Sequence, residues 1–188
     1  MGLVAAERAL YETVWSTVHN YGDFAPGEQH VRLFRAMSGA TEGTVLDAGC
    51  GSGKGALALA AAGFDVTCCD LTREGLVEDA RALPFRESCL WHLEPRAVGL
   101  YDYVYCCDVL EHIPTEYTML VIARLLGVAR VGAFLSIALV PDAFGVWVGT
   151  PLHQTVRDFV WWRDRLADMG QLVEARDLGT TGVYWVQT

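Results

Sequence analysis

The sequence predicts an α/β fold built on a mostly parallel sheet. Three short runs, residues 44–47, 64–70 and 101–108, are rich in apolar and β-branched side chains, and each ends in an aspartate. A further run, residues 133–140, is apolar on both of its alternating faces, as a central parallel strand should be. Segments with helical patterns separate these runs, and this alternation of strand and helix is typical of a parallel sheet.

Two helices are predicted ahead of the first strand. Apolar residues recur every three or four positions over residues 1–19, and Pro26 opens a second helix after a break. We expect residues 1–40 to form a helical cap and residues 41–188 to form the core of a single domain. A length of 188 residues agrees with one domain that buries a sizeable core.

The rest of the chain continues the alternation. Thr72 and Thr115 are each expected to cap the helix that follows them, and another helix is expected around residues 159–166. Two short strands, residues 172–175 and 183–186, are separated by glycines and close the chain.

The composition is that of a packed globular protein. Hydrophobic residues make up 52% of the chain and charged residues 20%. The net charge of −9 at pH 7 argues against a dedicated nucleic-acid-binding protein, which usually carries a basic face. We therefore expect no nucleic acid among its partners.

The cysteines and the N-terminus bear on location. The chain has six cysteines, several of them inside apolar runs and none with C-x-x-C spacing. This pattern favours buried, reduced thiols over disulfides or zinc ligands. The first residues resemble no signal peptide, and no apolar run approaches the roughly 20 residues that span a bilayer. We expect a cytoplasmic protein with no metal ion and no membrane contact.

A loop with glycines at alternate positions follows the first strand. Residues 47–53 read Asp-Ala-Gly-Cys-Gly-Ser-Gly, and a run of strong helix-forming composition comes next. Glycine allows a positive φ angle and places no Cβ between the backbone and a ligand. Strand, glycine loop and helix together form the arrangement that binds ligands at the carboxyl edge of a parallel sheet.

Two other kinds of glycine loop fit this stretch less well. A phosphate-binding loop would need glycine at Ala48 and a hydroxyl residue at Gly55, and both positions fail. The dinucleotide fingerprint matches formally at Gly51, Gly53 and Ala56, but the strand would then have to continue through the acid and the first glycine. A dehydrogenase that binds NAD is the corresponding alternative.

The acid at the end of the second run is placed to bind a nucleoside. Asp70 follows Gly49 by 21 residues. A carboxylate at this point accepts hydrogen bonds from the two ribose hydroxyls of a bound nucleoside, so it supports a nucleoside cofactor without choosing one. The competing interpretation is a helix-capping aspartate.

Two motifs together resemble those of class I S-adenosylmethionine-dependent methyltransferases. The first is Asp-x-Gly-x-Gly-x-Gly at residues 47–53, and the other is Tyr-Asp, an apolar strand and Asp-Val-Leu-Glu-His-Ile over residues 101–113. The resemblance covers roughly residues 24–188. It implies a Rossmann-like, doubly wound sheet with a C-terminal antiparallel hairpin, and S-adenosyl-L-methionine as the cofactor.

The resemblance also implies which residues hold the cofactor. Leu90 and Trp91 are expected beside the adenine, and residues 79–84 are a second possible register for that loop. Tyr11 and Tyr21, from the leading helical segment, are candidates to face the ligand, because an aromatic face attracts a sulfonium cation. The expected cofactor-binding residues are Asp47, Gly49, Cys50, Gly51, Gly53, Asp70, Leu71, Leu90, Trp91, Asp108 and Tyr21.

The implied activity is methyl transfer to a small-molecule acceptor that the sequence does not name. A hydroxyl or protonated amine acceptor needs a base within hydrogen-bond reach. His153, after the fifth strand, is the preferred base and His112 the second choice; Asp108 and Glu111 are weaker candidates. Each histidine could instead pack or cap a loop. The alternative from a different class is a protein of the same fold that binds S-adenosylmethionine or a nucleoside and catalyses nothing.

Overall fold

A seven-stranded sheet forms the centre of the computed structural model, which describes residues 2–23 and 25–188. The strands are β1 (Thr44–Ala48), β2 (Asp65–Asp70), β3 (Phe85–Glu87), β4 (Tyr101–Cys107), β5 (Ala129–Ala138), β6 (Gln171–Asp177) and β7 (Thr181–Gln187). Their order across the sheet is β3-β2-β1-β4-β5-β7-β6. Neighbours from β3 to β5 pair in parallel, whereas β7 pairs antiparallel with both β5 and β6.

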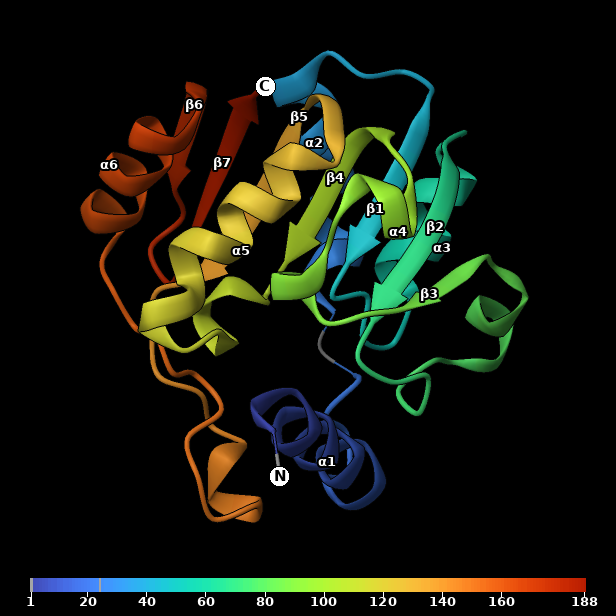
Figure 1. Cartoon of the computed structure of the whole chain (residues 1–188), viewed down its shortest axis with the longest axis vertical. Helices are drawn as coiled ribbons and strands as arrows, with labels where there is room; N and C mark the ends of the chain where they lie inside the picture. The colour runs from blue at the N-terminus through green and yellow to red at the C-terminus, as the bar shows by residue number, and fades with distance from the viewer. Residues whose placement is uncertain (1, 24) are drawn as a thin grey trace.

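Helices cover both faces of this sheet. The α-helices are α1 (Leu3–Thr17), α2 (Pro26–Ser38), α3 (Lys54–Ala61), α4 (Pro95–Val98), α5 (Thr115–Gly127) and α6 (Phe159–Met169), and the short 3₁₀ helices are η1 (Glu78–Ala82), η2 (Leu90–His92), η3 (Leu110–His112) and η4 (Gly145–Trp147). α2 and α3 pack on one face, and α5 and α6 pack on the other (Figure 1). The predicted doubly wound α/β fold with a C-terminal antiparallel pair is confirmed.

Side chains that alternate along each strand produce two cores. In β5, Phe134 meets Phe34 of α2 with ring centroids 5.9 Å apart. The next residue, Leu135, belongs to the opposite cluster together with Ile122 of α5. Full burial of a side chain of this size contributes about 1.5–3 kcal/mol. Burial on two faces is the physical reason why the central strands carry no polar alternation.

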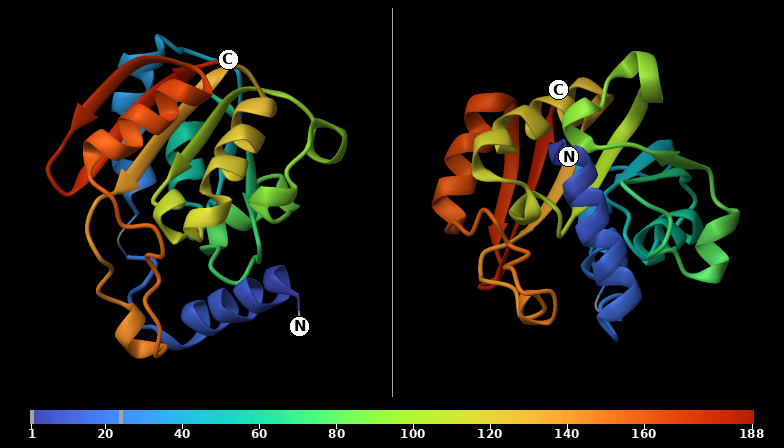
Figure 2. Two further views of the ribbon diagram at one scale, coloured as in Figure 1. Left: turned by 60° about the vertical axis from the view of Figure 1, so that its left-hand side comes forward. Right: turned by 60° about the horizontal axis from the view of Figure 1, so that its bottom comes forward.

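α1 lies across the carboxyl ends of the parallel strands, and not on a face of the sheet (Figures 1 and 2). Its Val14, together with Val18 just after the helix, packs with Leu152 in a small separate cluster. Its Arg8 pairs with Glu87 at the end of β3. The helix therefore closes over the edge at which an open α/β sheet binds its ligands.

The expected helix after Thr72 is wrong. The chain turns there, with the Thr72 hydroxyl accepting a hydrogen bond from the Glu74 N–H at 3.3 Å, and only η1 forms further on. Leu76 and Ala80 are both buried, and both lie against Gly53. Packing against the glycine loop thus overrides the local helix propensity of this segment.

The expected cap at Thr115 is also wrong. Thr115 is the first residue of α5, which follows Pro114 and has no side-chain cap. The Thr115 hydroxyl instead lies 2.9 Å from the Thr155 hydroxyl. A tertiary contact has replaced the local one, because residue 155 comes back to the start of α5.

Candidate active site

The glycine loop between β1 and α3 folds tightly onto the end of β2. The N–H groups of Gly49 and Cys50 both donate to the Cys69 carbonyl, at 2.8 and 3.1 Å. Gly49 has a φ angle of 78°, and a Cβ added there would lie 2.4 Å from the side chain of Val109. Glycine is therefore required at residue 49 by both the backbone conformation and the neighbouring loop.

Gly53 has a different role from the other loop residues predicted to hold the cofactor. It lines neither of the two cavities described below, and a Cβ there would lie 2.5 Å from that of Ala80. Its φ angle is 75°, in the left-handed region. Gly53 thus permits the close approach of η1 to the start of α3.

Asp47 lies at the end of β1 and is buried, with 4% of its surface exposed. Burial, and then the charge of Asp70, raise the pKa of Asp47 to about 7, although a backbone hydrogen bond from Ala56 opposes the shift. The protein therefore holds a carboxyl group here that is costly to ionise in the absence of a cation.

Asp70, at the end of β2, is fixed by backbone donors. One carboxylate oxygen accepts from the Gly51 N–H at 2.8 Å and the other from the Leu71 N–H at 2.7 Å. Burial raises the pKa of Asp70, and these hydrogen bonds oppose the rise. Each oxygen keeps a second lone pair that can accept a hydrogen bond from a ligand.

A cavity of about 110 Å³ opens beside Asp70. Leu71, Leu90 and Trp91 line it, and Tyr11 of α1 closes it. The third strand ends at Glu87, so the loop that follows it holds Leu90 and Trp91, whereas residues 79–84 precede the strand. The Trp91 ring is held in place by stacking on Tyr117, with ring centroids 5.3 Å apart.

A larger cavity of about 380 Å³ adjoins the first. Asp47, Cys50 and His153 line the larger cavity but not the smaller one. Residues common to both walls are Trp15, Tyr21, Gly49, Gly51, Asp108 and His112. The two spaces are thus neighbouring parts of one site at the carboxyl edge of the sheet.

Aromatic side chains form one wall of this larger cavity. Trp15 and Tyr21 meet edge to face with ring centroids 4.9 Å apart, and Tyr21 meets Phe144 in the same way at 5.3 Å. Tyr21 therefore lies between α1 and the loop after β5. Burial, followed by the charge of Asp108, raises the pKa of Tyr21 above its usual range, so its hydroxyl stays protonated at neutral pH.

Asp108 follows β4 and has an unusual backbone conformation. Its φ angle is 61°, and its N–H donates to the Ser136 carbonyl at 2.8 Å. A non-glycine residue in this region is uncommon and carries a conformational cost of about 1–3 kcal/mol. The conformation places Asp108 in the walls of both cavities.

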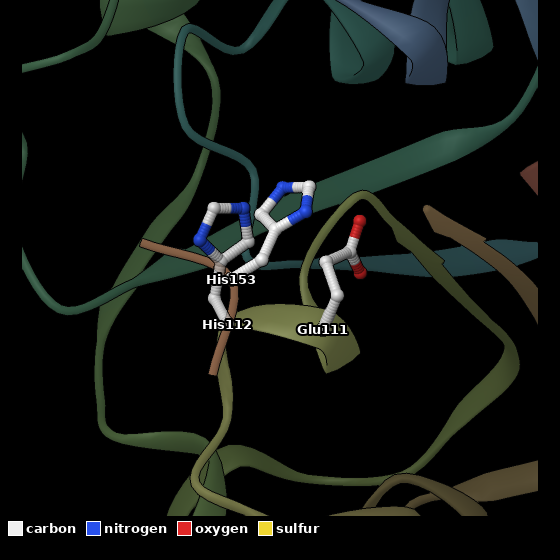
Figure 3. A group of neighbouring side chains, drawn as sticks. All are labelled: Glu111, His112 and His153. Atoms are coloured by element: carbon white, nitrogen blue, oxygen red, sulfur yellow. The ribbon is translucent and has the colours of Figure 1, made fainter. Parts of the chain in front are cut away.

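The two predicted histidines meet, although they come from different loops. Their ring centroids lie 4.7 Å apart, and both line the larger cavity (Figure 3). His112 Nδ1 lies 2.8 Å from the Tyr11 hydroxyl and 3.1 Å from the Leu152 carbonyl oxygen. Burial, and then the neighbouring His153, lower the pKa of His112 to about 4. His112 is therefore uncharged at neutral pH.

His153 is positioned by Asp142, a residue that the sequence predictions missed. His153 Nδ1 lies 2.7 Å from the Val140 carbonyl oxygen, and the backbone N–H of His153 donates to the Asp142 carboxylate at 3.2 Å. The Asp142 carboxylate also accepts the N–H groups of Phe144, Gly145 and Leu152. Burial acts to raise the pKa of Asp142, but these hydrogen bonds outweigh it and lower the pKa.

A signal for Asp142 existed in the sequence. Aspartate followed by residues of a turn commonly binds the backbone N–H groups two or three positions on. Its bonds to residues 152 and 153, however, depend on how the loop returns. They could be found only in the structure.

Glu111 lies in η3 and is completely buried, lining neither cavity. One carboxylate oxygen accepts the Ala138 N–H at 2.8 Å. The other has no hydrogen-bond partner among the residues that the structure describes. Burial, and then the nearby Asp108 carboxylate, raise the pKa of Glu111 well above its usual range. Its burial argues against direct contact with an acceptor.

Comparison with known proteins agrees with the fold and with the two motifs. The sequence profile of a family described as a methyltransferase domain matches residues 46–135, which include the glycine loop, Asp70 and the loop after β4. This part of the chain, from β1 to β5, is therefore similar to a methyltransferase domain. The resemblance predicted from the motifs is confirmed.

Curated relatives of the methyltransferase domain are ubiquinone biosynthesis O-methyltransferases. The one from Bordetella avium is 36% identical over 86 residues, which is 42% of this chain and 36% of the relative. The one from Nitrosomonas europaea is 33% identical over 85 residues, with the same shares. The matches thus span little more than a third of the relatives' length.

Solved structures show the same fold over nearly the whole chain. The DhpI–SAH complex has a TM-score of 0.75 at 18% identity and covers 100% of this chain and 97% of that one. The 1,6-didemethyltoxoflavin-N1-methyltransferase of Burkholderia thailandensis, bound to 1,6-didemethyltoxoflavin and S-adenosylhomocysteine, has a TM-score of 0.67 at 17% identity, covering 100% and 91%. Magnesium protoporphyrin IX methyltransferase from Synechocystis, with bound SAM, has a TM-score of 0.64 at 22% identity and covers 100% of this chain and 84% of that one.

None of the helices among the described residues combines the length and the apolar character needed to cross a bilayer.

Proposed function

We propose that the protein transfers a methyl group from S-adenosyl-L-methionine to a small-molecule acceptor. The observation that carries the proposal is the pair of adjoining cavities at the carboxyl edge of the sheet. One cavity contains an acid placed for a ribose, and the other contains two histidines. Gly49, Gly51 and Asp108 line both, so a ligand that fills the first would present its far end to the second.

The adenosine part of the cofactor would occupy the smaller cavity. The free lone pairs of Asp70 would accept the two ribose hydroxyls, while Leu90 and Trp91 would lie against the adenine. Leu71 completes the wall beside Asp70. The acid that commonly accepts the adenine amino group is missing from this loop, so apolar contact would provide most of the adenine binding.

The methionine part would extend along the glycine loop into the larger cavity. Asp47 and Cys50 line this region, and a carboxylate buried at 4% exposure is suited to an ammonium group. Tyr21 would face the sulfonium, whose positive charge is attracted by an aromatic ring. The acidic Asp108 lies on the same wall.

Methyl transfer is an in-line displacement in which the protein mainly aligns donor and acceptor. The acceptor's lone pair attacks the methyl carbon, the S–C bond breaks, and its electron pair stays on sulfur to give S-adenosylhomocysteine. Proximity of this kind accounts for roughly 7–11 kcal/mol of a barrier. His153 would take the proton of a hydroxyl or amine acceptor, with His112 as the second choice.

The charges of the larger cavity support a small acceptor that carries no negative charge. Its walls include the carboxyl groups of Asp47, Asp108 and Asp142, and no lysine or arginine lines it among residues 2–23 and 25–188. An anionic acceptor would lose its hydration without gaining a counter-charge. Nucleic acid, whose phosphates need basic side chains, is disfavoured for the same reason.

The cysteines support a reducing compartment such as the cytoplasm. All six are free, and five of them are buried. Free thiols are the rule in reducing compartments, where disulfides are rare.

Ligand binding and product formation test the proposal. S-adenosylhomocysteine should raise the melting temperature, because a ligand that binds only the folded state stabilises it by mass action. A shift with NAD and none with S-adenosylhomocysteine would contradict the cofactor assignment. Incubation with S-adenosylmethionine labelled in its methyl group and a panel of phenols and amines should then yield a labelled product. Binding without any product would favour the non-catalytic alternative.

A further inference from the structure

We propose that Glu111, His112 and His153 form a binding site for one divalent transition-metal ion of the zinc type. A carboxylate oxygen of Glu111 and one ring nitrogen of each histidine lie within 4.8 Å of one another. Figure 3 shows the three side chains extending side by side from neighbouring segments. Sequence spacing could not reveal this group, because residue 153 comes from a different loop.

The hydrogen bonds of the two histidines leave one nitrogen of each ring free. Nδ1 of His112 lies 3.1 Å from the Leu152 carbonyl, and Nδ1 of His153 lies 2.7 Å from the Val140 carbonyl. A carbonyl oxygen can only accept, which favours the proton on Nδ1 of both rings. The Tyr11 hydroxyl, 2.8 Å from Nδ1 of His112, can accept the same proton, so each Nε2 can keep a lone pair. Metal-binding histidines are commonly held in this way, with the other ring N–H on a backbone carbonyl.

Glu111 supplies the independent observation. It is completely buried, one of its oxygens is held by the Ala138 N–H, and the other lacks a partner in the described part of the chain. A buried carboxyl oxygen without a partner carries a desolvation cost that a bound cation would remove. The competing explanation is a proton shared between Glu111 and the nearby Asp108.

The donor set also fits the chemistry of the ion. Two imidazoles and one carboxylate are the protein ligands of one kind of catalytic zinc site, which leaves a fourth position open. Donors bound at about 2.0–2.2 Å in a tetrahedral site lie about 3.4 Å from one another, so side-chain rotations would have to draw the three atoms together from within 4.8 Å. Because both histidines line the larger cavity, the open position would face the acceptor.

The role of the ion, though not its binding, rests on the proposed function. An acceptor oxygen in the open position would have its pKa lowered, and its proton would pass to solvent before the oxygen attacks the methyl carbon. With the ion bound, the histidine nitrogens would hold it, and the general base role proposed for His153 would apply to the metal-free protein.

The test uses the full-length protein, freed of any affinity tag and of metal by dialysis against a chelator. Isothermal titration with zinc chloride should show one site, and cobalt chloride should give the visible absorption of a tetrahedral complex. Glu111→Gln and His153→Ala should each weaken zinc binding at least tenfold. His92→Ala, which removes an exposed histidine on η2, should leave it unchanged.

Each outcome decides the proposal. Absence of zinc binding, or binding that neither Glu111→Gln nor His153→Ala weakens, would overturn it and favour the proton shared with Asp108. S-adenosylhomocysteine binding, measured on the same samples, reports on the fold of each variant and on the proposed function. Intact cofactor binding without zinc binding would reject the metal site alone. Zinc binding without S-adenosylhomocysteine binding would keep the metal site and reject the methyltransferase role.

Discussion

Single carboxylates of this protein accept backbone hydrogen bonds while they line a cavity, and Asp70 is the clearest case. Its two oxygens hold the N–H groups of Gly51 and Leu71 while facing the smaller cavity. Removing the side chain would leave two backbone donors without a partner, at about 1–3 kcal/mol each. Asp70→Ala is therefore expected to lower stability as well as cofactor affinity.

Asp70→Asn separates these two effects better. The amide keeps one acceptor oxygen and the shape of the side chain, but it loses the charge that strengthens bonds to the ribose hydroxyls. We expect S-adenosylhomocysteine to bind at least tenfold more weakly by calorimetry. Asp65→Asn, at the exposed start of β2, is the matched control and should bind normally. Equal affinities for both variants would reduce Asp70 to a loop-ordering residue.

Asp47 predicts a pH-dependent stability of the ligand-free protein. Its folded-state pKa of about 7 lies above its usual value of 3.8, because burial penalises the charged form. Below pH 4 the group is protonated in both states, and between about 4 and 7 the unfolded state ionises first. The contribution of Asp47 to stability is therefore lost as the pH rises through this window.

Asp47→Asn should accordingly stabilise the ligand-free protein more at pH 8 than at pH 5. Urea unfolding at both pH values measures the free energy of unfolding of each protein. Contributions from the other titratable groups are the same in wild type and Asp47→Asn, so they cancel when the two proteins are compared. Asp65→Asn should show no such pH dependence. A stability difference between wild type and Asp47→Asn that stays constant with pH would contradict the assignment. The same substitution should weaken cofactor binding, since the carboxylate is proposed to meet the ammonium group.

His153 gives the kinetic prediction. His153→Ala should lower turnover by about 10²–10⁴-fold, the usual contribution of general base catalysis, with unchanged affinity for S-adenosylhomocysteine. The measurement requires an acceptor from the labelled-product screen. His92→Ala serves again as the control. A full rate in His153→Ala would leave alignment by the cavity as the main source of catalysis.

At the scale of elements, α1 is the part of the structure that completes the site. It contributes Tyr11 and Trp15 to the cavity walls and is held by several contacts to other segments. Arg8 pairs with Glu87, and Tyr11 meets His112 at 2.8 Å. The helix therefore links the rim of the smaller cavity to the histidine loop.

Tyr11→Phe tests this link. The loss of one hydrogen bond, worth about 0.5–1.5 kcal/mol, should weaken S-adenosylhomocysteine binding about two- to tenfold. Tyr103→Phe, which removes a hydroxyl on β4 away from both cavities, is the control. Calorimetry that finds the same affinity for both variants would show that α1 closes the cavity by packing alone.

At the scale of the whole molecule, the sequence determined the fold class, the strands whose ends reach the cavities and part of the cavity wall. These features are local. A β-branched run indicates a strand, and an acid at the end of the run marks the carboxyl edge of the sheet. Alternate glycines indicate a loop with positive φ angles. Leu90 and Trp91 came instead from the family resemblance, and the structure shows that their loop directly follows β3. Of the residues predicted to hold the cofactor, only Gly53 lies outside both cavities.

Only the tertiary structure decided how distant segments meet. The pairing of His112 with His153 requires β4 and β5 to be neighbours and the loop after β5 to return. Asp142 holds that loop by accepting the backbone N–H groups of Phe144, in the turn that follows it, and of Leu152, in the returning segment. The burial of Glu111 and the failed helix after Thr72 have the same origin. Sequence patterns report the period and chemistry of a segment, whereas a side chain's partners are set by packing between segments far apart in the chain, and packing outweighs local preference.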